Sequence, residues 1–299
     1  MIVASFDPSP MAVLRPESTP PRLSTTAQRV RWLREAGADE VELLTPEPSL
    51  LALPPEAFIE RITARWQPSA VIEGPDFRFG HRRAGSVETL AALGERFGFR
   101  SIVVPSVEAE LADQTIVPVR STMIRWLIER GRVADAARLL GRPFELECPV
   151  VRGAQRGREL GIPTANLDHG RMLLPADGVY AGLATLPDGS TRPAAISVGT
   201  NPTFGEAVRR CEVHVVDWRG DLDDYGWTLR VRFLGWLRDQ INYPGIDPLL
   251  TQIARDLDET RAAARMAESV VPSGTSSVPA RAATSAGASL GEPMSECSR

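Results

Sequence analysis

The sequence predicts an α/β domain with a parallel sheet, followed by a small β-barrel and a C-terminal helix. Strand-like apolar segments alternate with helical patterns over residues 1 to about 140, as in parallel sheets with crossover helices. Short strands separated by Gly, Pro and Asp dominate from Phe144 to Leu237. Asp247–Glu268 then reads as one helix with an apolar stripe and charges elsewhere.

In the first half, apolar clusters predict strands, and apolar residues three to four positions apart predict helices. Ser24 or Thr25 is expected to cap the first helix and Gly37 to end it. The expected strands are Ile2–Phe6, Glu40–Leu44, Ser69–Ile72 and Arg100–Val104. The expected helices are Thr25–Ala36, Pro55–Arg65, Val87–Phe97, Ser121–Arg130 and Val133–Leu140.

In the second half, Leu229, Val231 and Phe233 alternate with polar residues and should share one buried face. The expected strands are Glu147–Arg152, Gly178–Thr185, Arg192–Val198, Glu212–Asp217 and Thr228–Phe233. Residues 269–299 are rich in Ser, Ala, Gly and Pro, so we expect a disordered tail. The predicted domains are therefore residues 1–142 and 143–268, followed by this tail.

The composition is that of an ordinary globular protein. Of 299 residues, 43% are hydrophobic and 24% charged, and the net charge of −4 gives no general attraction to nucleic acid or anionic membranes. No apolar run is long enough to span a membrane, and residues 1–10 lack signal-peptide features. We expect a cytoplasmic protein without nucleic-acid or membrane partners, and no feature sets an oligomeric state.

Two residue types exclude whole classes of chemistry. The three cysteines, Cys148, Cys211 and Cys297, are far apart, which argues against a disulfide framework or a zinc site. The chain contains no lysine, so it has neither a Walker phosphate loop nor a lysine Schiff base. Any phosphate must be held by backbone N–H groups, arginines, hydroxyls or a metal ion.

The most informative stretch begins with three evenly spaced glycines. Gly153, Gly157 and Gly161 are four residues apart, which lets a backbone curl around an anion, and Arg158 adds positive charge. The glycine spacing alone is more typical of a solvent-facing hairpin loop. The continuation Pro163–Leu167 favours the phosphate interpretation.

That continuation carries oxygen ligands. Pro163 stiffens the exit from the loop, and Thr164 and Asn166 are two residues apart, so both side chains point to one side of an extended segment. A hydroxyl and an amide oxygen are hard ligands that suit Mg²⁺ bound to nucleotide phosphates.

A second candidate lies on the strand near residue 212. Glu212 and His214 share one face of this strand. A carboxylate on a barrel surface is either a solvated residue or a general base, and the solvated case is the commoner one. We expect His214 to be a structural histidine.

Together, these segments resemble the riboflavin kinase family. Its characteristic segments occur here in the family's order: Gly157–Leu167, Gly178–Ala181, Ser197–Phe204 and Glu212–His214. The resemblance implies a six-stranded barrel that transfers the γ-phosphate of ATP to the 5′-hydroxyl of riboflavin, giving FMN.

The resemblance also implies roles for individual residues. Thr164 and Asn166 would hold Mg²⁺ and the nucleotide phosphates, and Glu212 would accept the proton of the attacking hydroxyl. Arg238 would contact flavin or phosphate, although a surface arginine is about as common, and Tyr243 can stack where the family has Phe. The implied ATP-binding residues are Gly153, Gly157, Arg158, Gly161, Pro163 and Thr164.

The first half resembles the FMN adenylyltransferase module that precedes riboflavin kinase in many bacteria. The matching segments are Glu73–Gly85, Arg120–Arg125 and Leu139–Phe144. They imply a Rossmann-like nucleotidyltransferase domain whose helix N-terminus at Ser121 suits ATP phosphates. The implied site residues are Asp76, Phe77, Phe79, Gly80, Ser121, Thr122 and Arg125. The alternative for Glu73–Gly85 is an aromatic and Arg-rich loop packed on the sheet edge.

This half also departs from the family. The opening G-x-F-D-G-x-H-x-G-H segment is missing, and the only histidines are His81, His169 and His214. Ser5–Pro10 matches a later F-D-P-H-P segment, with Ser9 in place of its histidine. Either Met1 is an internal residue of a longer protein, or the module has lost adenylyl transfer and serves as a scaffold. A truncated sheet should expose a strand edge and apolar surface, which favours the first explanation.

The sequence thus predicts a riboflavin kinase fused to an adenylyltransferase module, with ATP, Mg²⁺ and flavins as ligands and without efficient FAD synthesis. The alternative is a non-catalytic flavin- or nucleotide-binding protein, which the intact Thr164, Asn166 and Glu212 disfavour. A nucleic-acid-binding barrel is disfavoured by the negative net charge.

Overall fold

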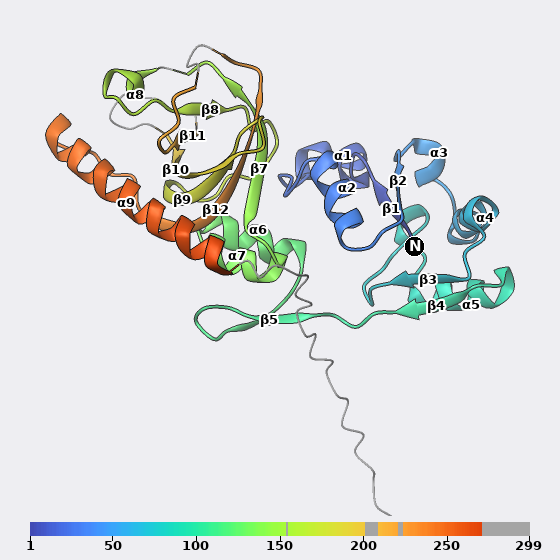
Figure 1. Cartoon of the computed structure of the whole chain (residues 1–299). Helices are drawn as coiled ribbons and strands as arrows, with labels where there is room; N and C mark the ends of the chain where they lie inside the picture. Colours follow the sequence, from blue (N-terminus) through green and yellow to red (C-terminus); the bar gives the residue numbers. More distant parts are fainter. Residues whose placement is uncertain (154, 201–208, 221–223, 271–299) are drawn as a thin grey trace, which may run out of the picture.

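A computed structural model describes residues 1–153, 155–200, 209–220 and 224–270. Figure 1 shows an α/β body beside a β-barrel, with one long helix lying along the barrel. Part of the Ser197–Phe204 motif and residues 271–299 of the predicted tail lie outside the described residues. None of the described helices combines the length and apolar character needed to cross a membrane.

The α/β body contains parallel strands, but in two separate sheets. Strand β1 (Ile2–Phe6) pairs with β2 (Glu40–Leu44), and β3 (Ala70–Glu73) pairs with β4 (Arg100–Val103). The predicted parallel pairing is confirmed, whereas the single sheet that we expected is divided into two strand pairs in the described part of the chain. The strand bounds agree with the prediction to within one residue.

Helices connect and cover these strands. Helix α2 (Thr26–Glu35) begins with a capping box in which the Thr25 and Gln28 side chains each accept from the other's backbone N–H. Helices α4 (Pro55–Trp66) and α5 (Val87–Phe97) pack around a small core. That core consists of Ile59, Phe79, Leu90 and Phe99. Two short helices, α1 (Pro10–Leu14) and α3 (Pro48–Leu51), were not predicted.

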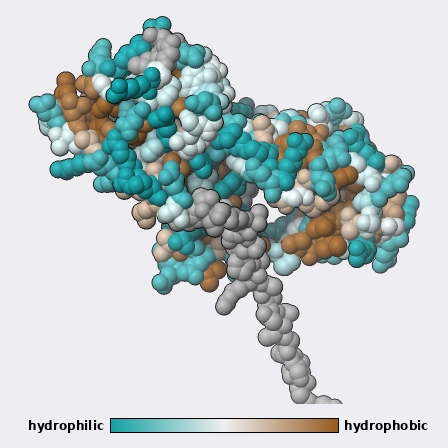
Figure 2. Space-filling model, in the orientation of Figure 1, coloured by the Kyte–Doolittle hydropathy of each residue, from teal (hydrophilic) through white to brown (hydrophobic). Residues whose placement is uncertain are grey.

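Much apolar surface of this body faces solvent. Ile72 on β3 is 53% exposed, and Val103 and Val104 at the end of β4 are 45% and 46% exposed. Figure 2 shows brown apolar areas on this part of the molecule. The exposed apolar surface that the sequence predicted is therefore present at β3 and β4.

The second body is a closed barrel of six antiparallel strands in the order β10-β11-β8-β7-β12-β9. The strands are β7 (Phe144–Val151), β8 (Ala165–Leu167), β9 (Gly178–Thr185), β10 (Thr191–Gly199), β11 (Arg210–Val215) and β12 (Thr228–Arg238). Leu229, Val231 and Phe233 are fully buried, as their alternation predicted. Burial also raises the pKa of the Cys148 thiol to about 11.

Helices cover part of the outside of the barrel. Helix α9 (Ile246–Val270) lies on β9, β10 and β12, so seven consecutive residues of β9 are buried although they alternate between its two faces. The predicted helix bounds, Asp247–Glu268, are nearly those observed. Helices α6 (Ser121–Glu129) and α7 (Val133–Leu140), with the hairpin of β5 (Glu108–Glu110) and β6 (Ile116–Pro118), share the core of the barrel. These elements therefore pack with the barrel, although they precede the boundary predicted at residue 142.

A polar network joins α2 to the barrel. The Arg31 guanidinium donates to Glu145 at 2.7 Å and to Glu147 at 3.2 Å, and Arg230 of β12 lies 3.3 Å from Glu147. Gln28 donates to the same Glu145 carboxylate at 3.1 Å. Because the Glu145 side chain is nearly buried, these partners supply the hydrogen bonds that water gives an exposed carboxylate.

Replacing Arg31 with Ala should lower the free energy of unfolding by about 1–3 kcal/mol, because a buried carboxylate loses its closest cation. Arg34→Ala, an exposed change on the same helix, is the control and should cost less than about 0.5 kcal/mol. Urea unfolding followed by circular dichroism measures both. Equal stability losses in the two variants would show that the network does not hold the two bodies together.

Candidate active site

The barrel has two hollows that share one lining residue, Thr164. The larger has a volume of about 770 Å³ and lies between the barrel and the first half of α9. The smaller has a volume of about 50 Å³ and lies beside residues 153–161, which contain the three spaced glycines and are called the Gly-rich segment below. Glu212 lines the larger hollow, and Asn166 lines the smaller one.

Strand pairing fixes these side chains relative to one another. Strand β8 pairs with β11 so that Asn166 lies opposite Glu212 and Ala165 lies opposite Val213. Residues directly opposite in an antiparallel pair point to the same face of the sheet. Val213 faces the barrel core, so Asn166 and Glu212 lie together on the outer face. The structure thus brings the predicted ligand and the predicted base side by side.

Two of the glycines permit close packing of the loop. A Cβ atom on Gly153 would lie 2.1 Å from Asn166 Nδ2, and one on Gly157 would lie 2.3 Å from the Ile162 carbonyl oxygen. Gly161 has a φ of +73°, a backbone conformation that glycine adopts without strain. The predicted loop also contains a one-turn helix, α8 (Arg156–Glu159), which the glycine spacing did not predict.

Asn166 is buried with an unsatisfied amide oxygen. Its Oδ1 atom has no hydrogen-bond partner, although the residue is only 8% exposed. Such a buried acceptor destabilises a fold by roughly 1–3 kcal/mol unless a ligand completes it. Within the described residues, no group of three or more His, Cys, Asp and Glu could hold a metal ion. The Asn166 amide and the Thr164 hydroxyl are oxygen ligands of the kind that Mg²⁺ accepts, so the residues fit this ion.

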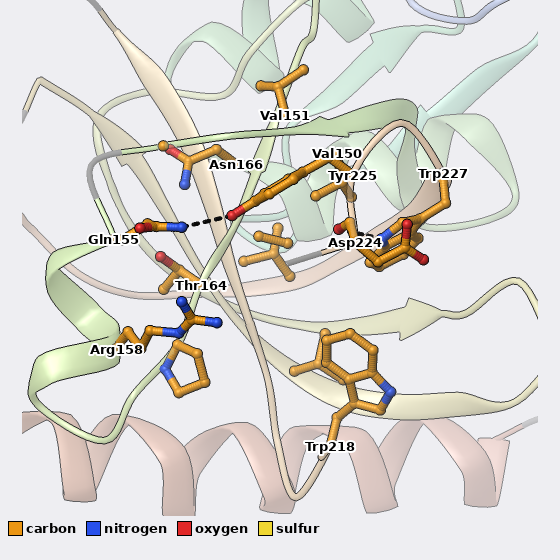
Figure 3. Close-up of a pocket in the computed structure, with 15 residues that line it drawn as sticks. Val150, Val151, Gln155, Arg158, Thr164, Asn166, Trp218, Asp224, Tyr225 and Trp227 are labelled. Atoms are coloured by element: carbon orange, nitrogen blue, oxygen red, sulfur yellow. Dashed lines mark hydrogen bonds between the residues drawn. The ribbon is translucent and has the colours of Figure 1, made fainter. Parts of the chain in front are cut away.

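Aromatic residues form the other side of the small hollow (Figure 3). Gln155 Nε2 donates to the Tyr225 hydroxyl at 2.7 Å, which ties the Gly-rich segment to the loop before β12. The rings of Trp218 and Trp227 pack against each other at 5.8 Å. Arg158 lies on the same side of the hollow as Thr164 (Figure 3). Sequence reasoning missed these aromatic residues, for which their clustering over residues 218–227 was the available signal.

Helix α9 supplies the apolar side of the larger hollow through Leu249, Ile253 and Leu257. Arg238, at the end of β12, also lines it. Its guanidinium makes a bidentate pair with the Asp256 carboxylate of α9, at 2.8 and 3.0 Å. Arg238 therefore anchors the helix that closes the hollow, while the flavin or phosphate contact proposed for it stays a prediction.

Polar side chains line the same hollow near Glu212. Ser197 lies opposite Glu212 on β10, and its hydroxyl accepts a hydrogen bond from Gln240 at 2.7 Å. The Nδ1 atom of His214 lies 2.8 Å from the carbonyl oxygen of Pro163. The sequence indicated that His214 shares a face with Glu212, and the structure shows which atom it contacts.

The α/β body has a hollow of its own, of about 490 Å³, at the carboxyl ends of β3 and β4. Asp76 and Phe77 line it together with Arg120, whose guanidinium pairs with the Asp76 carboxylate at 3.0 Å. Burial raises the pKa of Glu73, which also lines this hollow. Carboxyl ends of parallel strands are the usual ligand position in open α/β sheets.

The remaining predicted residues of this module do not line that hollow. Phe79 is buried and stacks on Phe77 with ring centres 5.3 Å apart, and Gly80 approaches Pro55 too closely to carry a Cβ. Ser121 and Thr122 begin α6, directly after Arg120. Arg125 donates to the carbonyl oxygens of Pro21 and Ser121, and burial lowers its pKa.

Comparisons with known proteins match two families to different parts of the chain. The FAD synthetase family matches residues 1–117, and the riboflavin kinase family matches residues 140–264. A solved structure described as a macrolide-efflux protein from Streptococcus pneumoniae shares 31% identity and superposes with a TM-score of 0.74. The match covers 87% of this chain and 83% of that one. The efflux description belongs to that protein alone, and no relative named below shares it.

Relatives described as bifunctional riboflavin kinase/FMN adenylyltransferase match along most of their length. The Escherichia coli K12 protein is 31% identical, with 86% of this chain and 80% of the relative covered. The Pseudomonas fluorescens protein is 33% identical (88% and 82%), and the Haemophilus influenzae protein is 30% identical (88% and 83%). The chain belongs to the bifunctional riboflavin kinase/FMN adenylyltransferase family.

Proposed function

We propose that the barrel is a riboflavin kinase that transfers the γ-phosphate of ATP to the 5′-hydroxyl of riboflavin. One observation carries this proposal: Thr164 lines both hollows, and of the neighbouring pair Asn166 lines the smaller hollow while Glu212 lines the larger one. A phosphoryl transfer needs two substrates held end to end, with charge stabilisation at the junction and a proton acceptor beside the attacking hydroxyl.

On the nucleotide side, the phosphates would lie between the Gly-rich segment and Thr164. Backbone N–H groups and Arg158 supply positive character there, as the absence of lysine requires. Mg²⁺, held by Thr164 and Asn166, would neutralise developing charge on the phosphates. A hollow of about 50 Å³ is smaller than a nucleotide, so binding in this proposal includes an outward movement of the segment.

On the flavin side, a hollow of about 770 Å³ is large enough for the isoalloxazine ring and its ribityl chain. The apolar residues Leu249 and Ile253 of α9 suit the ring. Ser197 and Gln240 suit the ribityl hydroxyls. Glu212 would accept the proton of the 5′-hydroxyl as that oxygen attacks the γ-phosphorus and ADP leaves.

For the first module, we propose a nucleotide site in the 490 Å³ hollow, with Asp76, Phe77 and the start of α6 around it. No histidine is among the described residues that line this hollow, and its cation, Arg120, is paired with Asp76, so the proposal includes weak stabilisation of charge during adenylyl transfer. The non-catalytic alternative has no support from the relatives, whose descriptions name two enzyme activities. A cytoplasmic location is part of the proposal, because the reaction consumes ATP.

Glu212→Gln should lower kcat for FMN formation by about 100- to 10,000-fold, because the amide cannot accept the hydroxyl proton. Chromatographic measurement of FMN from riboflavin, ATP and Mg²⁺ tests this. Glu259→Gln, an exposed change on α9, is the control and should retain the rate of the unaltered chain. An unaltered chain that makes no FMN would refute the kinase, and an active Glu212→Gln variant would refute the role of this carboxylate.

Asn166→Leu should abolish FMN formation while leaving the melting temperature equal or higher. The change removes a buried unsatisfied oxygen and keeps a side chain of similar shape. Calorimetry and the same chromatographic assay provide the two readings. A large loss of stability would mean that the Asn166 amide is a structural group, and full activity would mean that it is not a ligand of metal or phosphate.

The unaltered chain should accumulate FMN under the same conditions. It should form FAD at least roughly 100-fold more slowly than FMN, because no histidine among the described lining residues stabilises the charge that develops during adenylyl transfer. Liquid chromatography resolves the two flavins, and added FMN tests the second step alone. FAD formed as fast as FMN would show that adenylyl transfer proceeds without a histidine in the 490 Å³ hollow.

A further inference from the structure

The pairing of strand β8 with β11 stops at Ala165, one residue short of Thr164, which lines both hollows. The register pairs Glu212 with Asn166 and Val213 with Ala165, and one further step would set His214 opposite Thr164. The ladder ends before that step, because the strand begins at Ala165, two residues after Pro163 in the chain. Pro163, one residue further, has no N–H to donate, so a regular ladder cannot extend through that residue.

The His214 side chain supplies a hydrogen bond where the ladder stops. Its Nδ1 atom lies 2.8 Å from the Pro163 carbonyl oxygen. A carbonyl oxygen can only accept, so Nδ1 must carry the proton. The contact thus gives a carbonyl oxygen outside the ladder a side-chain donor from the neighbouring strand.

This contact also fixes the residue after Pro163. The Pro163 carbonyl and the Thr164 N–H belong to one planar peptide unit. A hydrogen bond that holds the carbonyl therefore sets the tilt of that plane and the direction in which Thr164 leaves it. Thr164 lines both hollows, so a rotation of this peptide would move its hydroxyl relative to both proposed substrates.

We propose that His214 is a positioning residue that orients Thr164 for phosphoryl transfer through its Nδ1–H bond to the Pro163 carbonyl. The proposal rests on the proposed kinase function and goes beyond it by assigning this histidine a role. His214 neither takes the proton from riboflavin nor holds the phosphate. Its loss should reduce kcat and weaken binding of Mg²⁺ and nucleotide, while the affinity for riboflavin changes little.

Three substitutions test the role of the Nδ1 atom. Asn places its amide N–H₂ on the same carbon as Nδ1, so His214→Asn keeps a donor near the Pro163 carbonyl. His214→Gln moves the donor one bond further along the side chain, and His214→Ala removes it. His81→Ala, an exposed histidine of the first module, controls for loss of an imidazole elsewhere.

We expect His214→Asn and His81→Ala to retain kcat within about three-fold of the unaltered chain, and His214→Gln and His214→Ala to lose about ten-fold or more. Hydrogen–deuterium exchange of the peptide covering residues 162–167 gives a second reading without activity. That peptide should exchange about five-fold faster in the Gln and Ala variants than in the Asn variant.

Two results would overturn the role of His214. In one, the Asn variant is as impaired as the Ala variant, so the ring itself is needed. In the other, none of the three variants differs from the unaltered chain. If the unaltered chain forms no FMN, the kinase proposal fails, and the exchange rates still decide whether His214 holds the Pro163–Thr164 peptide.

Discussion

The pairing of the three-residue strand β8 with β11 is the constraint on which the site depends. This short ladder sets Asn166 opposite Glu212 and turns both side chains outward from the core of the barrel. Its strength comes from the closed sheet, in which β8 is held between β7 and β11. A shift of one residue would turn Asn166 into the core and Ala165 outward, which the fixed apolar pattern of β11 prevents.

The rest of the site is added to this fixed pair by less regular contacts. The Gly-rich segment packs over Asn166 because Gly153 has no side chain, and Gln155 ties the segment to Tyr225. On the other side, α9 is held to β12 by the pair between Arg238 and Asp256. The barrel thus provides rigidity, while the segment and the helix enclose the two hollows. This arrangement is typical of sites in which loops carry ligands on a rigid scaffold.

Local pattern predicted most of the fold. Alternation in Thr228–Phe233, the caps of α2 and the apolar runs of β2 and β9 located these elements closely, since each depends on neighbouring residues. The one-turn helix α8 and the division of the parallel strands into two sheets were not predicted. The division into two sheets depends on contacts between residues distant in sequence, which a local pattern does not contain.

For the same reason, the sequence predicted some residues of the candidate site and missed others. Thr164, Asn166 and Glu212 stood in recognisable segments, and the structure brings them together. The aromatic side of the small hollow, the apolar side given by α9 and the bond of His214 to Pro163 arise only from packing. The pair between Arg238 and Asp256 likewise arises only from packing, while the ligand contact that the sequence suggested for Arg238 stays a prediction.

The most direct test is an experimental structure of the chain with riboflavin, ADP and Mg²⁺. The proposed site requires the isoalloxazine ring to lie against Leu249 and Ile253 of α9. The diphosphate should lie beneath the Gly-rich segment, with the metal ion bound by Thr164 and Asn166. Flavin found in the small hollow or in the α/β body, or a metal ion bound away from Thr164 and Asn166, would contradict the placement of the two substrates on either side of Thr164.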